Sequence, residues 1–552
     1  MLTVISAERD CARLEIKMRV LKLLLLGSTA AITSCVMARA ADLPSRKAAP
    51  IEYLRICDSY DSSFFYIPGT NTCLRIGGTI IAEEQLYSVS YRMANTIFGQ
   101  PNGVVAAKGG YTPSVLQYGN PTNAPISTFQ GVGRLELDAR TATEFGALRT
   151  FLRLESVYGT EGNAATGSLS GGANFAGGNY NNNTAFFATT RETTILNKGF
   201  IQFGGLTAGR AQSFFDFYAD AINWEMLRGS NATAGLFAYT QAFGKGLSAT
   251  FSIEDSTSRR DYIGSTLGSF DYGSAMGAPG FGTAYASVPD GARIPELVAN
   301  LRWDQEWGAI QLSGAAHRLR TSLYAKDATL VNPTAYAFPV AASEDFGFAL
   351  QLGTRFDLNN IASNVFPTGD KLWIQAAYEE GATGYIMGNN LNFNGGPVNA
   401  NIFYGYGNGG VKAANGWNYR PYDCIWTAAS LGHCDKSRGW AALVAFKHYW
   451  TSTISSGFYG SYMGLRYSAA ALADTGGGVG AVNTDEFRAA TNLVWTPVKN
   501  FDVGSEVMYV RANHLNRPVG LVADPWLVAS GLPSWKGVNG VFEGRIRAQR
   551  SF

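Results

Sequence analysis

Apolar and polar residues alternate with a period of two along many segments of this chain. The clearest case is residues 134–140, where four charged side chains fall on one face of an extended strand and three apolar ones on the other. Segments 149–155, 346–352, 371–378 and 501–509 repeat the alternation. A period of two is typical of a β-strand with one polar and one apolar face. The chain is therefore predicted to be all-β.

The amino-acid composition excludes several other classes of protein. Charged residues make up 16% of the 552 residues and aromatic residues 13%, whereas intrinsic disorder requires more charge and fewer aromatics. A helical membrane protein would show repeated apolar stretches of about 20 residues, and none follows residue 41. Because Lys and Arg number 44 and Asp and Glu 42, bulk charge gives no indication of nucleic-acid binding.

A soluble β-sandwich would also show alternation, but the distribution of charges, aromatics and loops favours a membrane barrel. The polar faces carry dense charges of both signs, as a wet lumen would, and aromatic residues lie at strand ends. Short turns, such as 303–308 and 496–500, alternate with long polar loops. We expect the long loops at 159–190, 256–293, 320–343 and 383–438. The prediction is a transmembrane antiparallel β-barrel of about 16 strands with long external loops.

An export signal is predicted at the start of the chain. Positive side chains at 19 and 22, an apolar run over 23–36 and the A-x-A site at 38–40 are the three parts of a cleavable signal peptide. We expect residues 1–17 to be an upstream mis-start and residues 18–40 to be the signal peptide. Residues 41–552 then form a single barrel domain.

Two alternatives to cleavage after residue 40 remain open at this point. The apolar run could stay as a membrane anchor, although it is short for that role. Residues 32–35 resemble a bacterial lipobox, which would place a lipid on Cys35. The A-x-A site that follows at once favours cleavage and export.

Four cysteines follow the leader, namely Cys57, Cys73, Cys424 and Cys434. An even number of cysteines in an exported protein suggests disulfides, and four allow three connectivities. Proximity favours Cys57–Cys73 and Cys424–Cys434. A zinc site would recruit His433, but there is no C-x-x-C pair, and we expect no metal.

The last strand is predicted over residues 541–552, which alternate polar and apolar side chains and end in Phe552. A closing strand with a terminal aromatic is what outer-membrane barrels present to their assembly machinery. We therefore interpret Phe552 as an assembly signal. An ordinary strand can also end in Phe by chance.

Several segments together resemble the alphaproteobacterial outer-membrane porins. The matching segments are 41–45, 53–60, 64–78 with its cysteine, 206–217, 495–504 and the terminal Phe552. This resemblance implies a 16-stranded barrel, a homotrimer, and a passive water-filled channel narrowed by a loop that folds into the lumen after Arg210. The chain is longer than expected for the family, and the excess falls in the long loops.

The constriction loop implied by the resemblance runs roughly from Ala211 to Gly235, and its acidic residues are Asp216, Asp220 and Glu225. The opposing lumen wall would supply basic side chains from two alternating strands: Arg134, Arg140, Arg149 and Arg153. An acidic loop facing a basic wall sets up a transverse field that orients dipolar solutes. Each of these charges could instead pair with a neighbour and brace the barrel wall.

Enzyme signatures are absent from the sequence. There is no H-E-x-x-H, G-x-S-x-G or Walker loop, and the G-x-G-x-x-G match at 405–410 lies in a Gly/Asn-rich loop with no helix after it. We predict a non-enzymatic porin for small hydrophilic solutes and ions, without a cofactor, embedded in outer-membrane lipid. The alternative is a barrel-anchored receptor or adhesin that uses the long loops at 159–190 and 383–438 and has a plugged or narrow lumen.

Overall fold

The computed structural model describes most of the chain after residue 55. The described residues are 56–57, 60, 63–87, 127–159, 191–256, 259, 262–265, 269–271, 285–289, 294–326, 336–387, 422–427, 433–473, 481–516 and 538–552. The predicted leader, the mature start and the lipobox cysteine lie outside them. So does most of the loops at 159–190 and 383–438.

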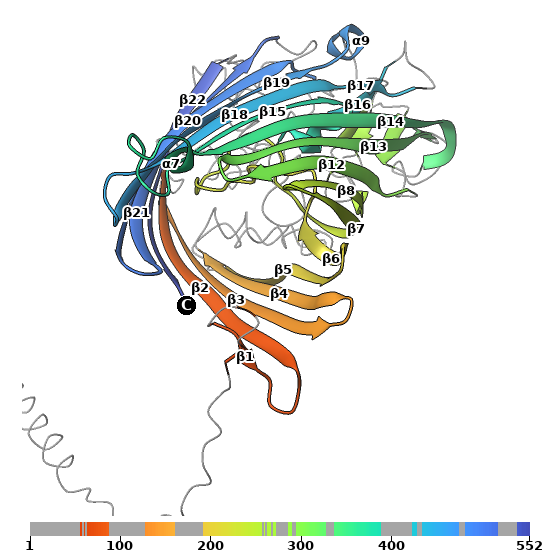
Figure 1. Ribbon diagram of the computed structural model, residues 1–552. Coiled ribbons are helices and arrows are strands. Elements are labelled where there is room, and N and C mark those ends of the chain that lie inside the picture. The colour runs from red at the N-terminus through yellow and green to blue at the C-terminus, as the bar shows by residue number, and fades with distance from the viewer. Residues whose placement is uncertain are drawn as a thin grey trace, which may run out of the picture. The chain divides into compact units, whose positions relative to one another are not determined.

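Sixteen antiparallel strands form a closed barrel (Figure 1). Each strand pairs with the next along the ring, and β2 pairs with β22 to close it, with Thr79 opposite Ser551. This confirms the predicted fold class. In ring order the strands are β2 (Thr72–Tyr87), β3 (Ser127–Thr143), β4 (Gly146–Gly159), β5 (Arg191–Phe203), β6 (Leu206–Gln212), β7 (Thr233–Gly244), β8 (Leu247–Glu254), β12 (Glu296–Gln305), β13 (Gly308–Lys326), β14 (Tyr336–Asp357), β15 (Lys371–Glu380), β18 (Arg438–Tyr449), β19 (Ile454–Arg466), β20 (Thr484–Val498), β21 (Phe501–His514) and β22 (Val538–Ser551).

Short elements occupy the ends of the barrel. The two-residue strand β1 (Phe65–Tyr66) pairs with β2, and β11 (Tyr285–Pro289) pairs with β13 and with β10 (Ser269–Asp271). A separate small sheet contains β9 (Tyr262–Ser265), β16 (Tyr422–Trp426) and β17 (Asp435–Lys436). The short helices are α7 (Leu358–Ile361), η5 (Thr383–Tyr385) and α9 (Ala469–Leu472). No helix in the described part of the chain is long and apolar enough to cross a membrane.

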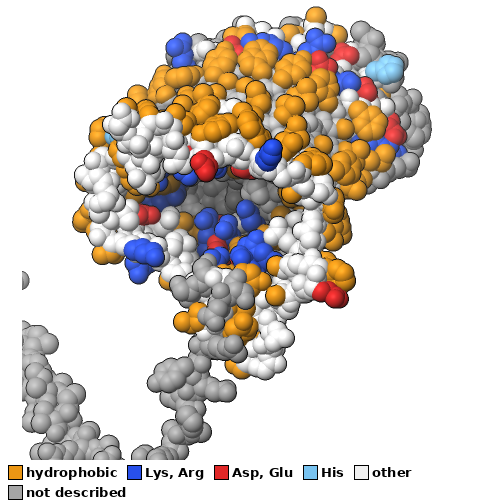
Figure 2. Space-filling view, viewed as in Figure 1, with side chains coloured by type: hydrophobic (Ala, Val, Ile, Leu, Met, Phe, Trp, Pro, Cys, Tyr) orange, Lys and Arg blue, Asp and Glu red, His pale blue; other side chains and the backbone are white. Residues whose placement is uncertain are grey.

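The alternation in sequence becomes the two faces of the barrel wall. In β14, Phe348, Leu350 and Leu352 are exposed on the outside, where lipid covers them, while Gln351 between them is buried. In β3, Arg134 and Asp138 point inward and Leu135 outward, because a strand places successive side chains on opposite faces. The wall therefore presents an apolar belt to lipid and a charged surface to the lumen (Figure 2).

The connections alternate between short turns at one end and long loops at the other. The turns between β3 and β4, β12 and β13, and β20 and β21 each span only two residues, as expected. The expected long loop at 320–343 is wrong in extent, because β13 continues to Lys326 and β14 begins at Tyr336. Register shifts at Leu323/Tyr324 and Ala325/Lys326 interrupt the alternation of side chains there. For this reason the sequence pattern did not predict where the two strands end.

Both ends of the described barrel chain are fixed at the short-turn end. The terminal Phe552 exchanges two backbone hydrogen bonds with Gly78 in β2, at 3.0 and 3.1 Å. The segment before β2 folds back and is joined to it by the Cys57–Cys73 disulfide. The aromatic ring of Phe64, in this same segment, is buried beside that disulfide. The second disulfide, Cys424–Cys434, gives the pairing that proximity favoured.

Candidate pore constriction

The loop between β6 and β7, residues 213–232, folds inward and follows the lumen wall. Its first part lies on β12, β13 and β14, whose side-chain amides hold its backbone. Asn300 donates to the carbonyl of Phe214 at 2.6 Å, and Gln351 donates to the carbonyl of Phe215 at 2.8 Å. Gln311 donates to the carbonyl of Asp216 at 3.0 Å. Side-chain amides suit this role because a loop backbone inside the barrel has no strand partner.

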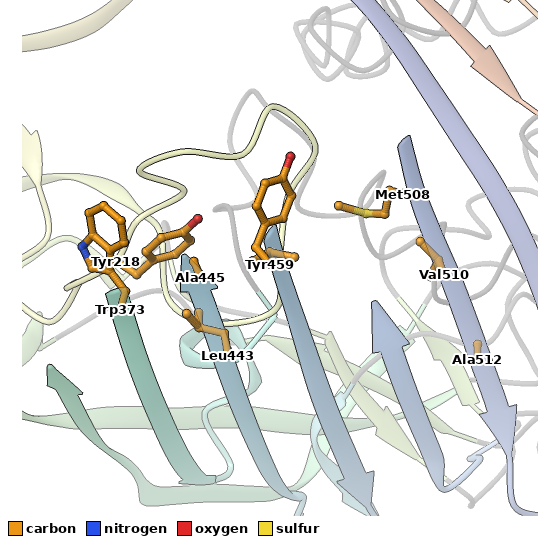
Figure 3. Packing of buried hydrophobic residues seen from close by; sticks show 9 residues of the cluster. Tyr218, Trp373, Leu443, Ala445, Tyr459, Met508, Val510 and Ala512 are labelled. Atoms are coloured by element: carbon orange, nitrogen blue, oxygen red, sulfur yellow. The ribbon is translucent and has the colours of Figure 1, made fainter. Parts of the chain in front are cut away.

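An apolar contact fixes the middle of this loop. Tyr218 packs edge-on against Trp373, with ring centroids 5.8 Å apart, in a cluster that includes Leu443 and Tyr459. Figure 3 shows Trp373, Leu443 and Tyr459 on neighbouring wall strands, with Tyr218 of the loop beside Trp373. The backbone N–H of Tyr218 donates to Gln375 at 3.0 Å. The loop is thus packed on the wall as well as hydrogen-bonded to it.

The tip of the loop is held by one carboxylate of β21. Glu506 accepts hydrogen bonds from the backbone N–H groups of Trp224, at 2.8 Å, and Glu225, at 2.7 Å. It also accepts from the hydroxyl of Tyr459. The side chain of Glu225 forms an ion pair with Arg545 of β22. Glu506 is therefore the main anchor of the tip.

The returning half of the loop is held by a buried charge network. Arg228 forms two hydrogen bonds of 2.8 Å with Glu486 in β20, and it donates to the carbonyl of Met387 at 2.6 Å. Arg488 pairs with the same carboxylate and donates to the carbonyl of Met226 at 2.7 Å. Two guanidinium groups around one carboxylate leave this network with a positive charge that buried carbonyl oxygens stabilise.

Asp216 closes the base of the loop. It accepts from the backbone N–H of Ala232 at 2.6 Å and from the hydroxyl of Ser230, and it pairs with the buried Arg259 at 3.0 Å. Burial alone would lower the pKa of the Arg259 guanidinium, but the attraction of nearby carboxylates, with Asp216 first, keeps that pKa above its usual value. Asp216 therefore joins the two ends of the loop.

Asp220 lies at a sharp bend of the loop, with a φ of 55°. Its carboxylate accepts from Asn223 at 2.7 Å and from Asn231 at 2.8 Å. Burial raises the pKa of Asp220, and these hydrogen bonds oppose that rise. Of the three acids predicted for the constriction, Asp216 and Glu225 are buried in contacts with their neighbours, and Asp220 is partly exposed.

The four predicted wall arginines lie together on the lumen side of β3 and β4. Arg134 pairs with Glu155 at 2.6 Å and Arg153 with Glu136 at 2.7 Å. Arg140 and Arg149 both pair with Asp138, at 2.9 and 3.0 Å. All four guanidinium groups keep contact with water, and Figure 2 shows basic side chains gathered on the wall of the opening. The arrangement combines wall bracing with a charged lumen surface.

Sequence reasoning missed two basic residues of this wall and the wall residues that anchor the loop. Arg75 of β2 lies opposite Asp138 and pairs with it at 3.6 Å, and Lys198 of β5 lies opposite Arg153. Both occupy lumen positions of alternating strands, so the period of two could have found them. The partners Arg228 and Glu486 are 258 residues apart, and no local pattern signals such a pair.

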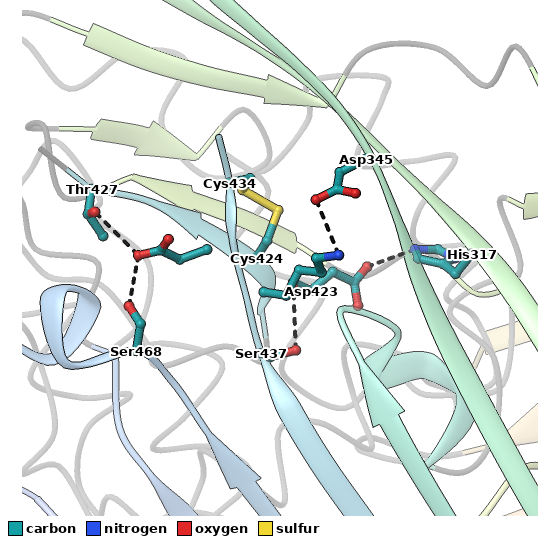
Figure 4. The surroundings of a disulfide bond; sticks show 10 residues. His317, Asp345, Asp423, Cys424, Thr427, Cys434, Ser437 and Ser468 are labelled. Atoms are coloured by element: carbon teal, nitrogen blue, oxygen red, sulfur yellow. Dashed lines mark hydrogen bonds and ion pairs between the residues drawn. A yellow bond between two sulfur atoms is a disulfide. The ribbon is translucent and has the colours of Figure 1, made fainter. Parts of the chain in front are cut away.

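A second buried network ties external segments to the wall near the other disulfide. His317 of β13 lies between Glu296, at 2.9 Å, and Asp423, at 3.4 Å, and Asp423 also accepts from the backbone of Thr383 at 2.9 Å. Figure 4 shows Asp423 beside the Cys424–Cys434 bond and facing His317. This network holds part of the loop between β15 and β18 on the lumen side of β13.

A comparison with known protein families shows to which family this barrel belongs. The family model described as the porin subfamily matches residues 42–530. The chain belongs to this family. Porin Omp2b of Brucella canis is 29% identical over 298 residues, which cover 52% of this chain and 64% of that relative. Porin Omp2b of Brucella suis is 28% identical over 301 residues, covering 51% and 69%. This chain therefore matches about two thirds of the length of these porins.

Among solved structures, the outer membrane channel DcaP of Acinetobacter baumannii aligns with 88% of this porin and 99% of its own length. The TM-score is 0.50 and the identity is 12%, so the likeness concerns the fold. The family and the 16-strand barrel make the protein a β-barrel of the outer membrane.

Proposed function

We propose that this porin forms a water-filled channel for the passive diffusion of small hydrophilic solutes and ions across the outer membrane. The observation that carries the proposal is the one-sided position of loop 213–232. It is bonded to wall strands from β12 round to β22, and the arc from β2 to β5 keeps its arginine side chains in contact with water. A closed barrel with a fixed inner loop and one hydrated wall has the parts of a selective passive pore.

The residues predicted for the constriction then divide into two roles. Asp216 and Glu225 hold the loop to itself and to the wall, and Asp220 borders the lumen. Arg134, Arg140, Arg149 and Arg153 form the opposing surface. A fixed loop keeps the pore size constant, and exposed guanidinium groups act on passing ions. None of these groups needs to react chemically with a solute.

We further propose that the protein works as a homotrimer, as its family resemblance implies, with outer-membrane lipid around the assembly. The exposed apolar belt, including Phe348, Leu350 and Leu352, supports contact with lipid. Phe552, exposed at the end of β22, supports recognition by the barrel assembly machinery. Export through residues 18–40 and a single domain over 41–552 complete the proposal.

Planar-bilayer recording of the purified, detergent-folded protein tests the function. We expect stepwise openings, and grouping of the steps in threes would indicate the trimer. Uptake of small sugars by liposomes that contain the protein is the second measurement. A folded barrel that neither conducts ions nor admits sugars would contradict the channel proposal and favour the receptor alternative.

A further inference from the structure

We propose that the channel prefers anions, and that Arg75, Arg140 and Arg149 form a binding subsite for small oxyanions such as phosphate. The inference rests on the proposed diffusion function and names the solute class. It follows from three observations: the charge balance of the open wall, the geometry of the arginine cluster, and the state of the loop acids.

The open wall has an excess of positive charge. On β2, β3, β4 and β5 the described lumen-facing side chains include six basic and four acidic ones, a net charge of +2. The basic ones are Arg75, Arg134, Arg140, Arg149, Arg153 and Lys198, and the acidic ones are Glu83, Glu136, Asp138 and Glu155.

Exposure to water increases this imbalance. The side chains of the five arginines on β2, β3 and β4 are 26–35% exposed, whereas Asp138 is 1% and Glu155 7% exposed. Asp138 and Glu155 thus lie behind the guanidinium groups that they hold, whereas Glu136 is 24% exposed, about as much as its partner Arg153. An ion in the lumen meets the arginines first, and a nearer charge contributes more to the potential at the ion.

The excess is greatest around Asp138. Arg75, Arg140 and Arg149 all pair with this one carboxylate, at 3.6, 2.9 and 3.0 Å, so the cluster carries a local charge of +2. Cross-strand pairing places Arg75 opposite Asp138 and Arg140 opposite Arg149. The three guanidinium groups therefore surround one point of the wall, near the short-turn end of the lumen.

Aromatic rings hold the same guanidinium groups in place. Arg140 lies 4.8 Å and Arg75 5.3 Å from the ring centroid of Phe64, which the Cys57–Cys73 disulfide fixes beside β2. Arg149 lies 5.2 Å from the ring centroid of Phe151. Stacked, planar guanidinium groups are pre-organised donors for the oxygens of phosphate or carboxylate.

The loop acids cannot balance this cluster. Glu225 is paired with Arg545 and Asp216 with Arg259, so each is neutralised where it lies. Asp220 accepts hydrogen bonds from two asparagines and a backbone N–H on its own loop. The transverse field therefore comes mainly from the basic wall.

Reversal potentials of the full-length folded protein in a potassium chloride gradient test the proposal. The test variant is Arg140→Gln with Arg149→Gln, and the matched control is the same change at Arg438, which faces outward with a 69% exposed side chain. A unit charge about 8 Å from an ion in water changes its local concentration about twofold. Removing two such charges should lower the chloride-to-potassium permeability ratio at least about fourfold at low salt.

Inorganic phosphate serves as the probe for the subsite. We expect millimolar phosphate to reduce the chloride conductance of the wild type and of Arg438→Gln, and to reduce that of the double variant much less. Asp138→Asn is a second variant, in case the double variant fails to fold, and it should raise the permeability ratio because it removes the central negative charge.

The possible outcomes separate this inference from the proposed function. A channel that conducts but prefers potassium, or a ratio equal in the wild type and both test variants, would overturn the anion inference and leave the diffusion channel standing. A conducting anion channel whose phosphate block survives in the double variant would overturn the subsite. A folded protein without conductance would overturn both proposals.

Discussion

Replacing Glu506 with alanine should release the tip of the constriction loop. This carboxylate accepts hydrogen bonds from the backbone N–H groups of Trp224 and Glu225 and from the hydroxyl of Tyr459. Glu506, Glu225 and Tyr459 are buried, and Trp224 is half-buried. Alanine leaves both N–H groups without these bonds. A buried donor without a partner costs about 1–3 kcal/mol, so the docked state should lose about 2–6 kcal/mol.

The functional effect follows from that range. Since about 1.4 kcal/mol changes an equilibrium tenfold, a loss of about 2–6 kcal/mol makes the undocked tip at least about 25 times more populated relative to the docked one. Single-channel recording should then show fluctuating current in Glu506→Ala and steady current in the wild type. The rest of the loop stays attached through Asp216 and the Arg228–Glu486 pair, so the barrel should remain folded.

Glu506→Gln separates hydrogen bonding from charge. Both variants remove the same negative charge, so both should shift ion selectivity alike, but glutamine keeps one oxygen that can accept a loop N–H. The current noise should therefore be largest in Glu506→Ala, smaller in Glu506→Gln and smallest in the wild type. Asp357→Asn is the control for a lost carboxylate, because its partners Arg355 and Lys371 lie on wall strands near the short turns.

The reasoning is refuted if Glu506→Ala conducts as steadily as the wild type. Equal noise in the alanine and glutamine variants would mean that charge, and not the pair of backbone hydrogen bonds, holds the tip.

Three further predictions concern the loop base, the disulfide and the last residue. Asp216→Asn should destabilise the loop by about 3–5 kcal/mol, because it leaves the buried Arg259 without its carboxylate. Asp220→Asn should leave the current noise nearly unchanged, and equal single-channel noise in the two variants would contradict this difference. Replacing Cys57 and Cys73 with serine should lower the free energy of unfolding by about 3 kcal/mol, since the disulfide closes a loop of about 15 residues. The temperature at which the folded band disappears from a gel should therefore fall, and an unchanged temperature would contradict this prediction. Removal of Phe552 should reduce the yield of folded barrel in the outer membrane, and a normal yield would argue against the assembly role.

The strands were predictable because their signal is local. Residues 134–140 and 149–155 alternate charged and apolar side chains, and this alone places Arg134, Arg140, Arg149 and Arg153 on one face of the wall. The alternation fails where strands extend past the lipid, as at the bulges near residue 324. There both faces of a strand can be polar, and the period no longer reports the strand.

The loop and its anchors were not predictable from local sequence. That Asp216 is buried depends on Arg259, which belongs to a different loop, and the loop tip depends on Glu506, about 280 residues further along the chain. The sequence of the loop gives the number of acidic side chains but not which of them face water. Which acids are exposed and which are paired decides the sign of the field in the pore, and this depends on tertiary contacts.

Loop docking and ion preference have a common cause in the wall acids. Glu506 and Glu486 bind the loop, and Glu83 pairs with Arg545 and Arg547 beside it. These three carboxylates, on β21, β20 and β2, are therefore buried in contacts with the loop and its neighbouring arginines. On the other side of the barrel, Asp138 of β3 pairs with Arg140, with Arg149 of β4 and with Arg75 of β2, and the side chains of these arginines are 27–35% exposed. The contacts that place the loop on one side of the barrel thus leave a basic surface on the other. It follows that a change that undocks the loop, such as Glu506→Ala, should alter pore size and ion selectivity together, whereas a change in the Asp138 cluster should alter selectivity alone.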